Sequence, residues 1–427
     1  MLHYNNPVQH DEIYNNNKTI DEQQLVQHNK LDITNTQWCI DKCMELLGQC
    51  TTYYRDAINS NNYNKSLYNG TLALPTLNYI LYESNLNRNH ADRHNILLNV
   101  HKYIDILYQQ IVTDHQIGTH HDTTPSTFII GHCTVLCMNA VVKSLLNESY
   151  DDFIQQLIDM STRVLHINAD EVLYGKVGYI QMMLFLLDHG ILDSIDQQHI
   201  QLTISSVLDS IISDGEQLEH NIDSPLMWQW HGKFYLGHAH GLSGILSIIL
   251  RCRWYLNDSR LICKIRQTIE YCMKQCYPSG NYKSSIESDN DRLVQWCHGS
   301  TSLALLCIEA YQHFSDDKHL QCAVNQSNII WERGLLNKGV GLCHGISGNA
   351  AVFLHLYQIT NNKLYLRRAE YFMEFGLNSQ YTNELFSQPD DPYSLYNGIG
   401  GAVLVMCDLI DIRNDRQHKL QLSAYGL

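Results

Sequence analysis

The stretch that decides the fold is GVGLCHGISGNAAVFLHLY, residues 339–357. A cysteine, a histidine and a glycine stand in a row there, followed by a second glycine and an apolar run. Residues 294–311 repeat the arrangement as VQWCHGSTSLALLCIEAY. A glycine permits close backbone approach, and a run that is apolar on nearly every side indicates a buried helix. The two stretches therefore predict two buried helices, each beginning beside a Cys-His-Gly triplet.

The same form occurs seven times along the chain. Each copy has a small or polar lead-in, a glycine, often a second small residue three positions later, and then an apolar stretch. Amphipathic segments lie between the copies, as in KLYLRRAEYFMEFG at residues 363–376, whose apolar side chains share one face of a helix. The lead glycines of the seven copies are Gly70, Gly131, Gly175, Gly241, Gly299, Gly345 and Gly398.

Each unit is thus expected to be a buried helix followed by an amphipathic helix that covers it. Seven such pairs predict an all-α fold, a closed α/α toroid with inner helices ringed by outer ones and all seven glycines at one end. An open solenoid of helix pairs is the second interpretation, but it needs polar capping repeats that the sequence lacks. We expect one toroid domain over residues 41–427 and a loosely ordered, Asn/Gln-rich tail over residues 1–40.

Composition excludes several classes of function. A formal net charge of −15 argues against a nucleic-acid or anionic-membrane surface, since both require basic patches. No apolar run approaches the roughly 20 residues of a membrane span, and the N-terminus lacks the pattern of a secretory signal. A soluble, cytoplasmic protein is expected. Its 14 cysteines should then be reduced, and close Cys/His spacing indicates a metal site or catalysis.

The doubled triplet supplies candidate metal ligands. Cys297, Cys343 and His344 offer two thiolates and an imidazole, the three-ligand set of a catalytic zinc site that keeps one position open. The alternative is that they are ordinary buried residues at helix starts. Both triplets hold the same offset from the repeat glycine, which favours the metal. His298 is left open as a ligand, as a residue that orients a ligand, or as a group that acts on substrate.

Five motifs, taken together and in this order, resemble the LanC-like proteins, the eukaryotic relatives of the lanthionine cyclases. The resemblance covers roughly residues 65–427. The motifs are DEVLYGKVGY at 170–179, AHGLSGI at 239–245, WCHG at 296–299, GLCHG at 341–345 and PYSLYNGIGG at 392–401.

The resemblance implies a seven-pair α/α toroid with one zinc ion bound by Cys297, Cys343 and His344, and His240 as the acid/base residue. Bacterial members add a peptide cysteine to dehydroalanine or dehydrobutyrine. Eukaryotic members bind glutathione and couple it to such residues in proteins. Glutathione and a dehydroamino-acid peptide are therefore the expected partners. Zinc would deprotonate the thiol, and His240 would stabilise the enolate or deliver a proton.

Further residues are candidates for catalysis or substrate binding. The cyclases carry an aspartate near the position of Asp170 and Glu171, although helix capping explains these carboxylates nearly as well. Arg292 lies one residue from the place of a family arginine. Lys338 matches a lysine of the eukaryotic members and is suited to a glutathione carboxylate, or it is a solvated loop residue.

The chain also departs from the pattern of the family. Asn397 replaces an acidic residue, and Ser300 and Thr301 replace a small-Pro pair. His238 stands where a small residue is usual. We expect these changes to touch the wall of the pocket and to alter substrate preference rather than zinc binding.

Three functions follow from the sequence. The first is zinc-dependent addition of glutathione to dehydroamino acids, and the second is a zinc- and glutathione-binding adaptor without turnover. The third is a toroid glycosidase, which requires two carboxylates that flank a sugar. Asp170 or Glu171 supplies one such carboxylate, but the other repeat mouths carry cysteine and histidine, so this function ranks last.

Overall fold

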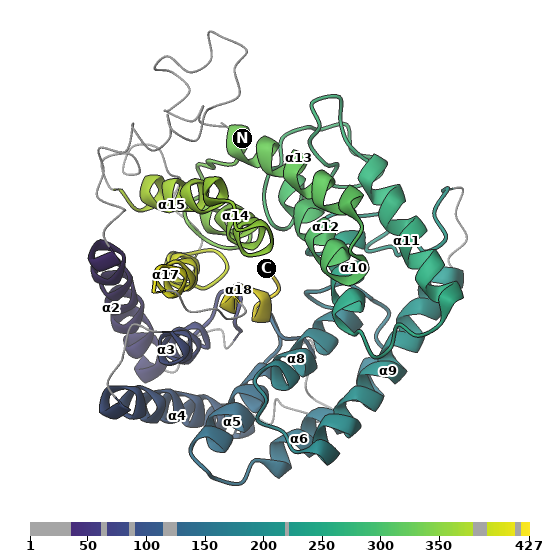
Figure 1. The fold of residues 1–427 in the computed structure, drawn as a ribbon. Helices are drawn as coiled ribbons and strands as arrows, with labels where there is room; N and C mark the ends of the chain where they lie inside the picture. The colour runs from purple at the N-terminus through teal and green to yellow at the C-terminus, as the bar shows by residue number, and fades with distance from the viewer. Residues whose placement is uncertain are drawn as a thin grey trace.

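The computed structural model describes residues 36–60, 66–84, 90–113, 126–217, 222–378, 391–414 and 420–427. Its helices form two concentric rings (Figure 1). The inner ring consists of α3 (Ala73–Glu83), α5 (Thr134–Leu145), α8 (Lys176–Asp188), α10 (Leu242–Arg251), α12 (Ser300–Phe314), α14 (Ile346–Thr360) and α17 (Gly400–Arg413). The outer ring consists of α2 (Thr36–Ser60), α4 (His90–Thr113), α6 (Asp151–Asp159), α9 (Ser194–Gln217), α11 (Ser259–Lys274), α13 (Asp317–Arg333) and α15 (Lys363–Leu377).

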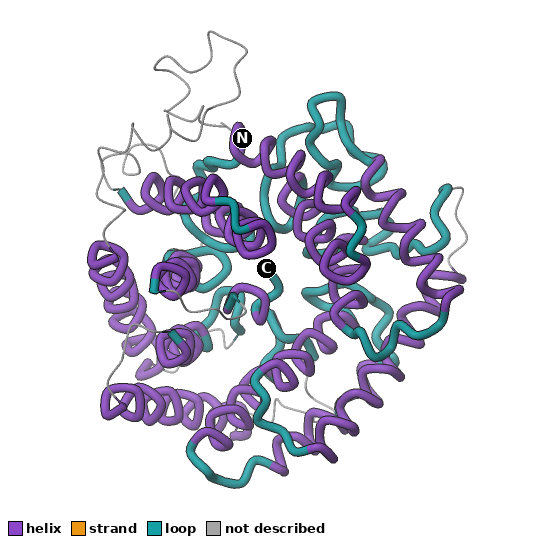
Figure 2. Tube along the Cα trace, in the orientation of Figure 1, coloured by secondary structure: helices purple, strands orange, loops and turns teal. Residues whose placement is uncertain are grey.

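Two short helices complete the described chain, α7 (Ser161–Val164) and α18 (Gln421–Ala424). Figure 2 shows helices joined by loops, and within the described ranges the β-pairing is limited to isolated bridges such as the one between Trp230 and Lys233. The all-α toroid expected from the seven copies is therefore confirmed. Each inner helix begins within a few residues of its lead glycine.

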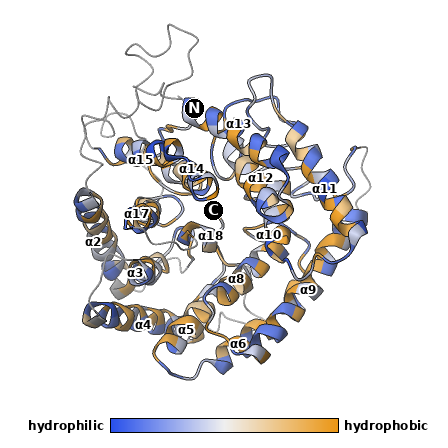
Figure 3. Ribbon diagram, in the orientation of Figure 1, coloured by the Kyte–Doolittle hydropathy of each residue, from blue (hydrophilic) through white to orange (hydrophobic). Residues whose placement is uncertain are grey.

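Burial differs between the two rings as their sequences predict. In α8 every residue from Lys176 to Leu186 is buried, so the helix has no exposed face. In α11 the buried residues are Ile265, Thr268, Ile269 and Cys272, which fall on one stripe. Outer helices such as α9 and α11 mix hydrophilic and hydrophobic residues along their length (Figure 3). The core therefore lies around the inner ring, between it and the outer one.

Side-chain caps fix where several outer helices begin. Asp258, Asp316 and Asn362 precede α11, α13 and α15, and each accepts a hydrogen bond from the backbone N–H two residues later. Such a cap satisfies a donor that the first helical turn leaves free, and it contributes about 1 kcal/mol. Because each cap fixes the residue at which its outer helix begins, it also fixes the length of the loop that leads there from the inner ring.

The ring closes between the two ends of the chain. Helix α2, the first outer helix, packs against α17, the last inner helix (Figure 1). The thiols of Cys43 on α2 and Cys407 on α17 are 3.7 Å apart and fully buried. An open solenoid would leave both faces exposed, so that second interpretation was wrong.

The lead glycines lie at one end of the ring, because hydrogen bonds link each mouth to the next and return to the first. We use "mouth" for a lead glycine with the few residues before it. Close approach of backbone is needed here, and a Cβ at Gly244 or Gly348 would collide with the carbonyl of the preceding loop. The links, donor first, are Tyr68–Ile129, Phe128–Gly178, Val172–Ala239, His238–Ser302 Oγ, Cys297–Cys343, Cys343–Tyr396 and Tyr396–Tyr68.

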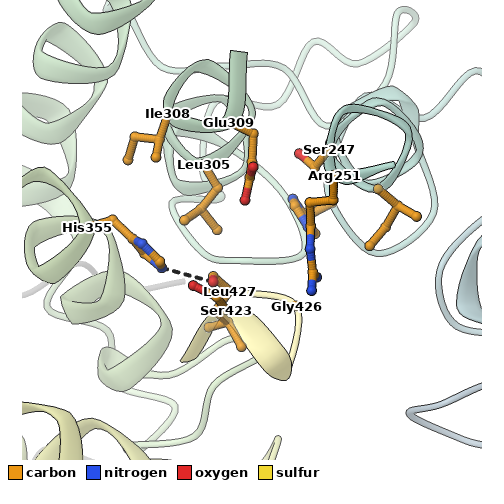
Figure 4. A pocket seen from close by; sticks show the side chains of 11 residues that line it. Ser247, Arg251, Leu305, Ile308, Glu309, His355, Ser423, Gly426 and Leu427 are labelled. Carbon is orange, nitrogen blue, oxygen red and sulfur yellow. Dashed lines mark hydrogen bonds between the residues drawn. The ribbon is translucent and has the colours of Figure 1, made fainter. Parts of the chain in front are cut away.

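The last described residues, 420–427, fill the centre of the ring (Figure 1). The Tyr396 hydroxyl donates to the Tyr425 carbonyl at 2.6 Å, and the Trp296 indole donates to the Gly426 carbonyl at 2.9 Å. His355 on α14 hydrogen-bonds the carbonyl of Leu427 at 2.9 Å beside a small cavity (Figure 4). The toroid therefore has a packed centre rather than an open channel.

The expected polar tail lies mostly outside the described residues, which begin where α2 begins, at Thr36. All 14 cysteines fall within the described ranges and all are free, consistent with the expectation of reduced thiols. None of the helices in the described ranges combines the length and the apolar character needed to cross a membrane.

Candidate functional site

The residue directly before six of the seven lead glycines brings a polar side chain to the end of the ring where the mouths meet, and Gly131 is preceded by Ile130 instead. The residue one position earlier carries the link to the neighbouring mouth. Cys297 and Cys343 both occupy this earlier position, and the N–H of Cys297 donates to the Cys343 carbonyl at 3.3 Å. Six residues with polar side chains directly precede a lead glycine, namely Asn69, Tyr174, His240, His298, His344 and Asn397.

The structure brings the thiols of Cys297 and Cys343 together. The two side chains share a hydrogen bond, which lowers the pKa of the Cys297 thiol and raises that of Cys343. Gln295 Nε2 donates to Cys297 Sγ at 2.9 Å, and the positive charge of Lys338 favours the thiolate form of both cysteines. Lys338 therefore lies near the thiol pair.

Tyr68 belongs to the same cluster, and the sequence analysis missed it. Its side chain hydrogen-bonds Cys343, and its ring stacks on Tyr396 with centroids 5.5 Å apart and planes 13° apart. The first and last mouths both read LYNG, so Tyr68 and Tyr396 hold the repeat position of the two cysteines. That shared offset was the signal that would have placed Tyr68 beside the thiols.

The donor set suits a zinc ion in its chemistry. Two buried thiols already in contact are the soft ligands that zinc prefers, and His344 follows Cys343 directly in the half-buried mouth. Across the described ranges, no three side chains of histidine, cysteine, aspartate or glutamate already form a cluster that would hold a metal. The thiol pair is thus in contact, and no third histidine, cysteine, aspartate or glutamate completes a metal-binding cluster with it among the described residues.

His240 is held by a buried carboxylate. Its Nδ1 lies 2.6 Å from Glu171 Oε2, and Glu171 is only 2% exposed. The same carboxylate accepts hydrogen bonds from the backbone N–H groups of Leu173 and Tyr174, which fix its own orientation. A carboxylate on Nδ1 leaves Nε2 as the nitrogen available to a ligand. The Glu171–His240 pair is therefore arranged like the orienting pair of an acid/base histidine.

Aromatic rings surround His240. The rings of Tyr174 and Trp230 lie nearly parallel to it, with centroids 6.3 Å and 6.0 Å away, and Tyr235 lies 5.9 Å away. Trp230 comes from a tight turn closed by its bridge to Lys233, with φ of 47° at His231 and 75° at Gly232. These rings restrict water around the imidazole on several sides.

His298 lies between the thiol pair and His240. Its ring centroid is 5.9 Å from that of Tyr235, which also contacts His240. Burial, together with the nearby charges of His240 and Lys338, lowers the pKa of His298 to about 4. His298 is therefore neutral near pH 7, and its buried Nδ1 has no hydrogen-bond partner within the described part of the chain.

Two other candidates lie apart from this cluster. Asp170 pairs with Lys176 Nζ at 3.0 Å, and Lys176 also contacts Asp214 on α9. Burial is the main cause that raises the pKa of Asp170 to about 6. Arg292 is exposed on the loop that leads to Cys297. Of the adjacent carboxylates, the structure brings Glu171 to His240 and leaves Asp170 in an ion pair.

The departures from the family pattern are mostly inside the core. Ser300 Oγ donates to Asn281 Oδ1 at 2.8 Å, and Thr301 Oγ1 donates to Asn349 Oδ1 at 2.6 Å. Both residues are fully buried, so the expectation that they line the pocket wall was wrong. They stabilise the start of α12. His238 is also buried and packs against Trp296 at 5.4 Å.

Asn397 is buried in the last mouth. Its N–H donates to Ser394 Oγ at 3.1 Å, and its side-chain oxygen has no partner among the described residues. Among the departures, Asn397 and His238 each keep a buried side-chain atom, Oδ1 and Nδ1, without a hydrogen-bond partner in the described part of the chain.

Comparison with known proteins gives a consistent result. The sequence matches the lanthionine synthetase C-like protein family over residues 61–422. It is 34% identical to glutathione S-transferase LANCL1 of Danio rerio over 291 residues, which cover 66% of this chain and 71% of that protein. It is 29% identical to LanC-like protein GCL1 of Arabidopsis thaliana over 304 residues, 66% of this chain and 67% of that protein.

A solved structure agrees with the architecture. Nisin cyclase superposes with a TM-score of 0.66 over 89% of this chain and 96% of its own, at 16% sequence identity. At that identity the likeness concerns the fold, and it matches the ring of helix pairs described above.

Proposed function

This chain belongs to the family of lanthionine synthetase C-like proteins, and from that premise we propose that it catalyses zinc-dependent addition of a thiol to an unsaturated amino acid. The thiol is glutathione, and the acceptor is a dehydroalanine or dehydrobutyrine residue in a peptide or protein. The name of the Danio rerio relative, a glutathione S-transferase, supports glutathione as the thiol. The thiol pair and the oriented His240 support addition chemistry.

The metal is assigned to Cys297, Cys343 and His344. When bound there, zinc would lower the pKa of a coordinated glutathione thiol and supply it as a thiolate. Gln295 and Tyr68 hydrogen-bond the two cysteines and hold their side chains in place. Lys338 adds a positive charge beside them, which attracts a tripeptide that carries two carboxylates.

His240 acts as the proton donor. Attack of the thiolate on Cβ forms the C–S bond and moves the π electrons of the double bond toward Cα and its carbonyl. A proton delivered to Cα from His240 Nε2 completes the addition of S–H across the double bond, so no oxidant or leaving group is required. Glu171 keeps Nδ1 engaged and stabilises the charge of the ring when Nε2 is protonated.

One observation carries this proposal, namely that His240 is oriented by a buried carboxylate at the same end of the ring as a pair of contacting thiols. An adaptor that only binds zinc and glutathione has no use for such a pair. A glycosidase needs two carboxylates facing a sugar. Here Glu171 is bound to His240 and to backbone N–H groups, and Asp170 is bound to Lys176.

The test is incubation of the zinc-loaded protein with glutathione and a dehydroalanine peptide, followed by mass spectrometry. We expect the peptide to gain the mass of one glutathione faster than in a reaction without protein, and a zinc chelator should remove the difference. A rate equal to the protein-free rate would overturn the proposal. Persistence of the full rate after zinc has been removed would overturn the metal assignment.

A further inference from the structure

A second cavity opens beside Trp230, and neither Cys297 nor Cys343 is among the residues that line it. It has a volume of about 630 Å³, within the usual range for ligand sites. Three segments form its walls, namely the loop at Asn168 and Asp170, the last turn of α9 at Asp214 and Gln217, and the turn that carries Trp230. None of these residues has a role in the thiol addition proposed above.

The charges in this wall do not balance. Lys176 is 4% exposed and pairs with both Asp170 and Asp214, so two carboxylates share one ammonium group. The Asp214 side chain is 46% exposed and thus remains accessible from the cavity. One negative charge is left over, which favours a cationic ligand.

Asp214 also stands at an unfavourable place in its helix. It lies in the last turn of α9, where the partial negative charge of the helix end repels a carboxylate, and that turn contains no basic residue. Glu216 in the same turn is compensated by Lys264 on α11 at 2.7 Å. The helix end and Asp214 therefore add their negative potentials at the wall of the cavity.

Aromatic rings complete the wall. Trp228 is anchored by its indole N–H, which donates to the Ile211 carbonyl at 2.8 Å, and by close approach of Gly215 on α9. Trp230 is half-buried and lines the cavity, while its ring centroid is 6.0 Å from that of His240. Indole rings bind ammonium and guanidinium groups through cation–π contacts. Trp230 thus joins the cavity to the candidate acid/base residue.

We propose that this cavity binds a lysine or arginine side chain of the peptide whose dehydroamino acid is modified. The inference rests on the proposed function, and it adds a sequence preference to that function. The ring centroids of Trp230 and His240 are 6.0 Å apart, and this distance corresponds to roughly two residues of extended peptide. The cationic residue is therefore placed within about two positions of the dehydroamino acid.

The experiment measures binding without chemistry. Fluorescein-labelled peptides carry alanine at the reactive position and lysine, glutamine or glutamate two positions away on either side, and fluorescence anisotropy gives their dissociation constants. We expect the lysine peptide to bind about fivefold more tightly than the glutamine peptide, and the glutamate peptide to bind most weakly. The preference of the wild-type protein for lysine should shrink as salt is raised. Equal binding of the three peptides would overturn the proposal.

A matched pair of variants separates the cavity from the overall acidity of the protein. Asp214→Asn and Glu216→Gln each remove one negative charge from the same turn of α9. We expect Asp214→Asn to reduce the lysine preference to within about twofold and Glu216→Gln to retain it. Equal effects of the two variants would assign the preference to net charge and overturn the site. Because no turnover is needed, a lysine preference in a protein that shows no glutathione addition would refute the proposed function and leave only the cation-binding cavity standing.

Discussion

At the scale of single residues, one carboxylate gives the histidine its orientation. Glu171 is 2% exposed and holds His240 Nδ1 at 2.6 Å, and backbone N–H groups hold Glu171 in turn. An imidazole fixed in this way presents Nε2 in one direction. A substrate can therefore meet a positioned proton donor rather than a mobile side chain.

The cysteines give the first prediction. Replacing Cys343 with alanine should release the zinc, since the site loses one of three ligands. The helical content should stay nearly unchanged, because the rings pack through apolar side chains rather than through the metal. Metal analysis of the purified variant, alongside circular dichroism, checks both statements. A variant that keeps one zinc per chain would refute the ligand assignment.

The motifs of the sequence placed the cysteines and histidines correctly at the mouths, but they could not choose between Asp170 and Glu171. Adjacent residues at the end of a loop point in different directions, and which of them meets His240 depends on how the third and fourth mouths dock. The link from the Val172 N–H to the Ala239 carbonyl sets that docking, and it joins two neighbouring mouths that are far apart in sequence. Tyr68 was missed because its mouth carries tyrosine where two later mouths carry cysteine, although its offset from the lead glycine is the same.

At the scale of elements, the mouths depend on glycine. Gly299 precedes α12 with φ of 94°, and a Cβ there would collide with the Leu293 carbonyl oxygen. Gly48, by contrast, lies exposed inside helix α2 with open space around it. The same replacement of glycine with alanine should therefore have opposite effects on stability at these two positions.

We expect Gly299→Ala to lower the free energy of unfolding by about 2–4 kcal/mol, because it combines an unfavourable φ with a steric clash. Gly48→Ala should raise the free energy of unfolding by about 0.5–1 kcal/mol, since alanine favours the helix. Urea unfolding of both variants gives the comparison. Similar stabilities for the two variants would contradict the account of the mouths.

The outer helix α15 predicts a dependence on pH. Burial, assisted by the charge of Glu370, raises the pKa of Glu374 from 4.5 to about 7. Folding thus favours the protonated carboxyl group. The stability that the folded protein gains from the protonated Glu374 carboxyl group is fully present below pH 4.5. It is lost as the pH rises through about 7.

Glu374→Gln removes this titration and should therefore stabilise the protein at pH 8 by on the order of 2 kcal/mol, with little effect at pH 4.5. Chemical unfolding of the wild type and the variant at both pH values measures the difference. An equal change at the two pH values would show that Glu374 does not titrate in this range.

At the scale of the whole molecule, the ring is a frame that brings seven separate mouths to one place. The repeat pattern sufficed to predict the number of helix pairs and the end at which the glycines meet, since both follow from periodicity. The sequence predicted a closed ring, but that α2 closes it on α17 and that residues 420–427 fill its centre could not be predicted. Both depend on contacts between distant segments that carry no shared motif.

The same frame explains how binding and chemistry are divided. Three sectors of one end of the ring carry the thiol pair, the Glu171–His240 pair and the cavity beside Trp230. A thiol held at the thiol pair and a peptide held in the cavity beside Trp230 would meet beside the Glu171–His240 pair. In the function we propose, His240 uses this joint binding of thiol and peptide for turnover.

The most direct measurement of that claim is the turnover of His240→Ala with glutathione and a dehydroalanine peptide, per folded and zinc-loaded molecule. We expect zinc content and glutathione affinity to stay close to wild type while turnover falls at least about 100-fold, the loss expected for a positioned acid/base group. Turnover within about threefold of wild type would contradict it, because a positioned proton donor contributes far more than that. His240 would then be a packing residue, and the adaptor function would stand level with the enzyme.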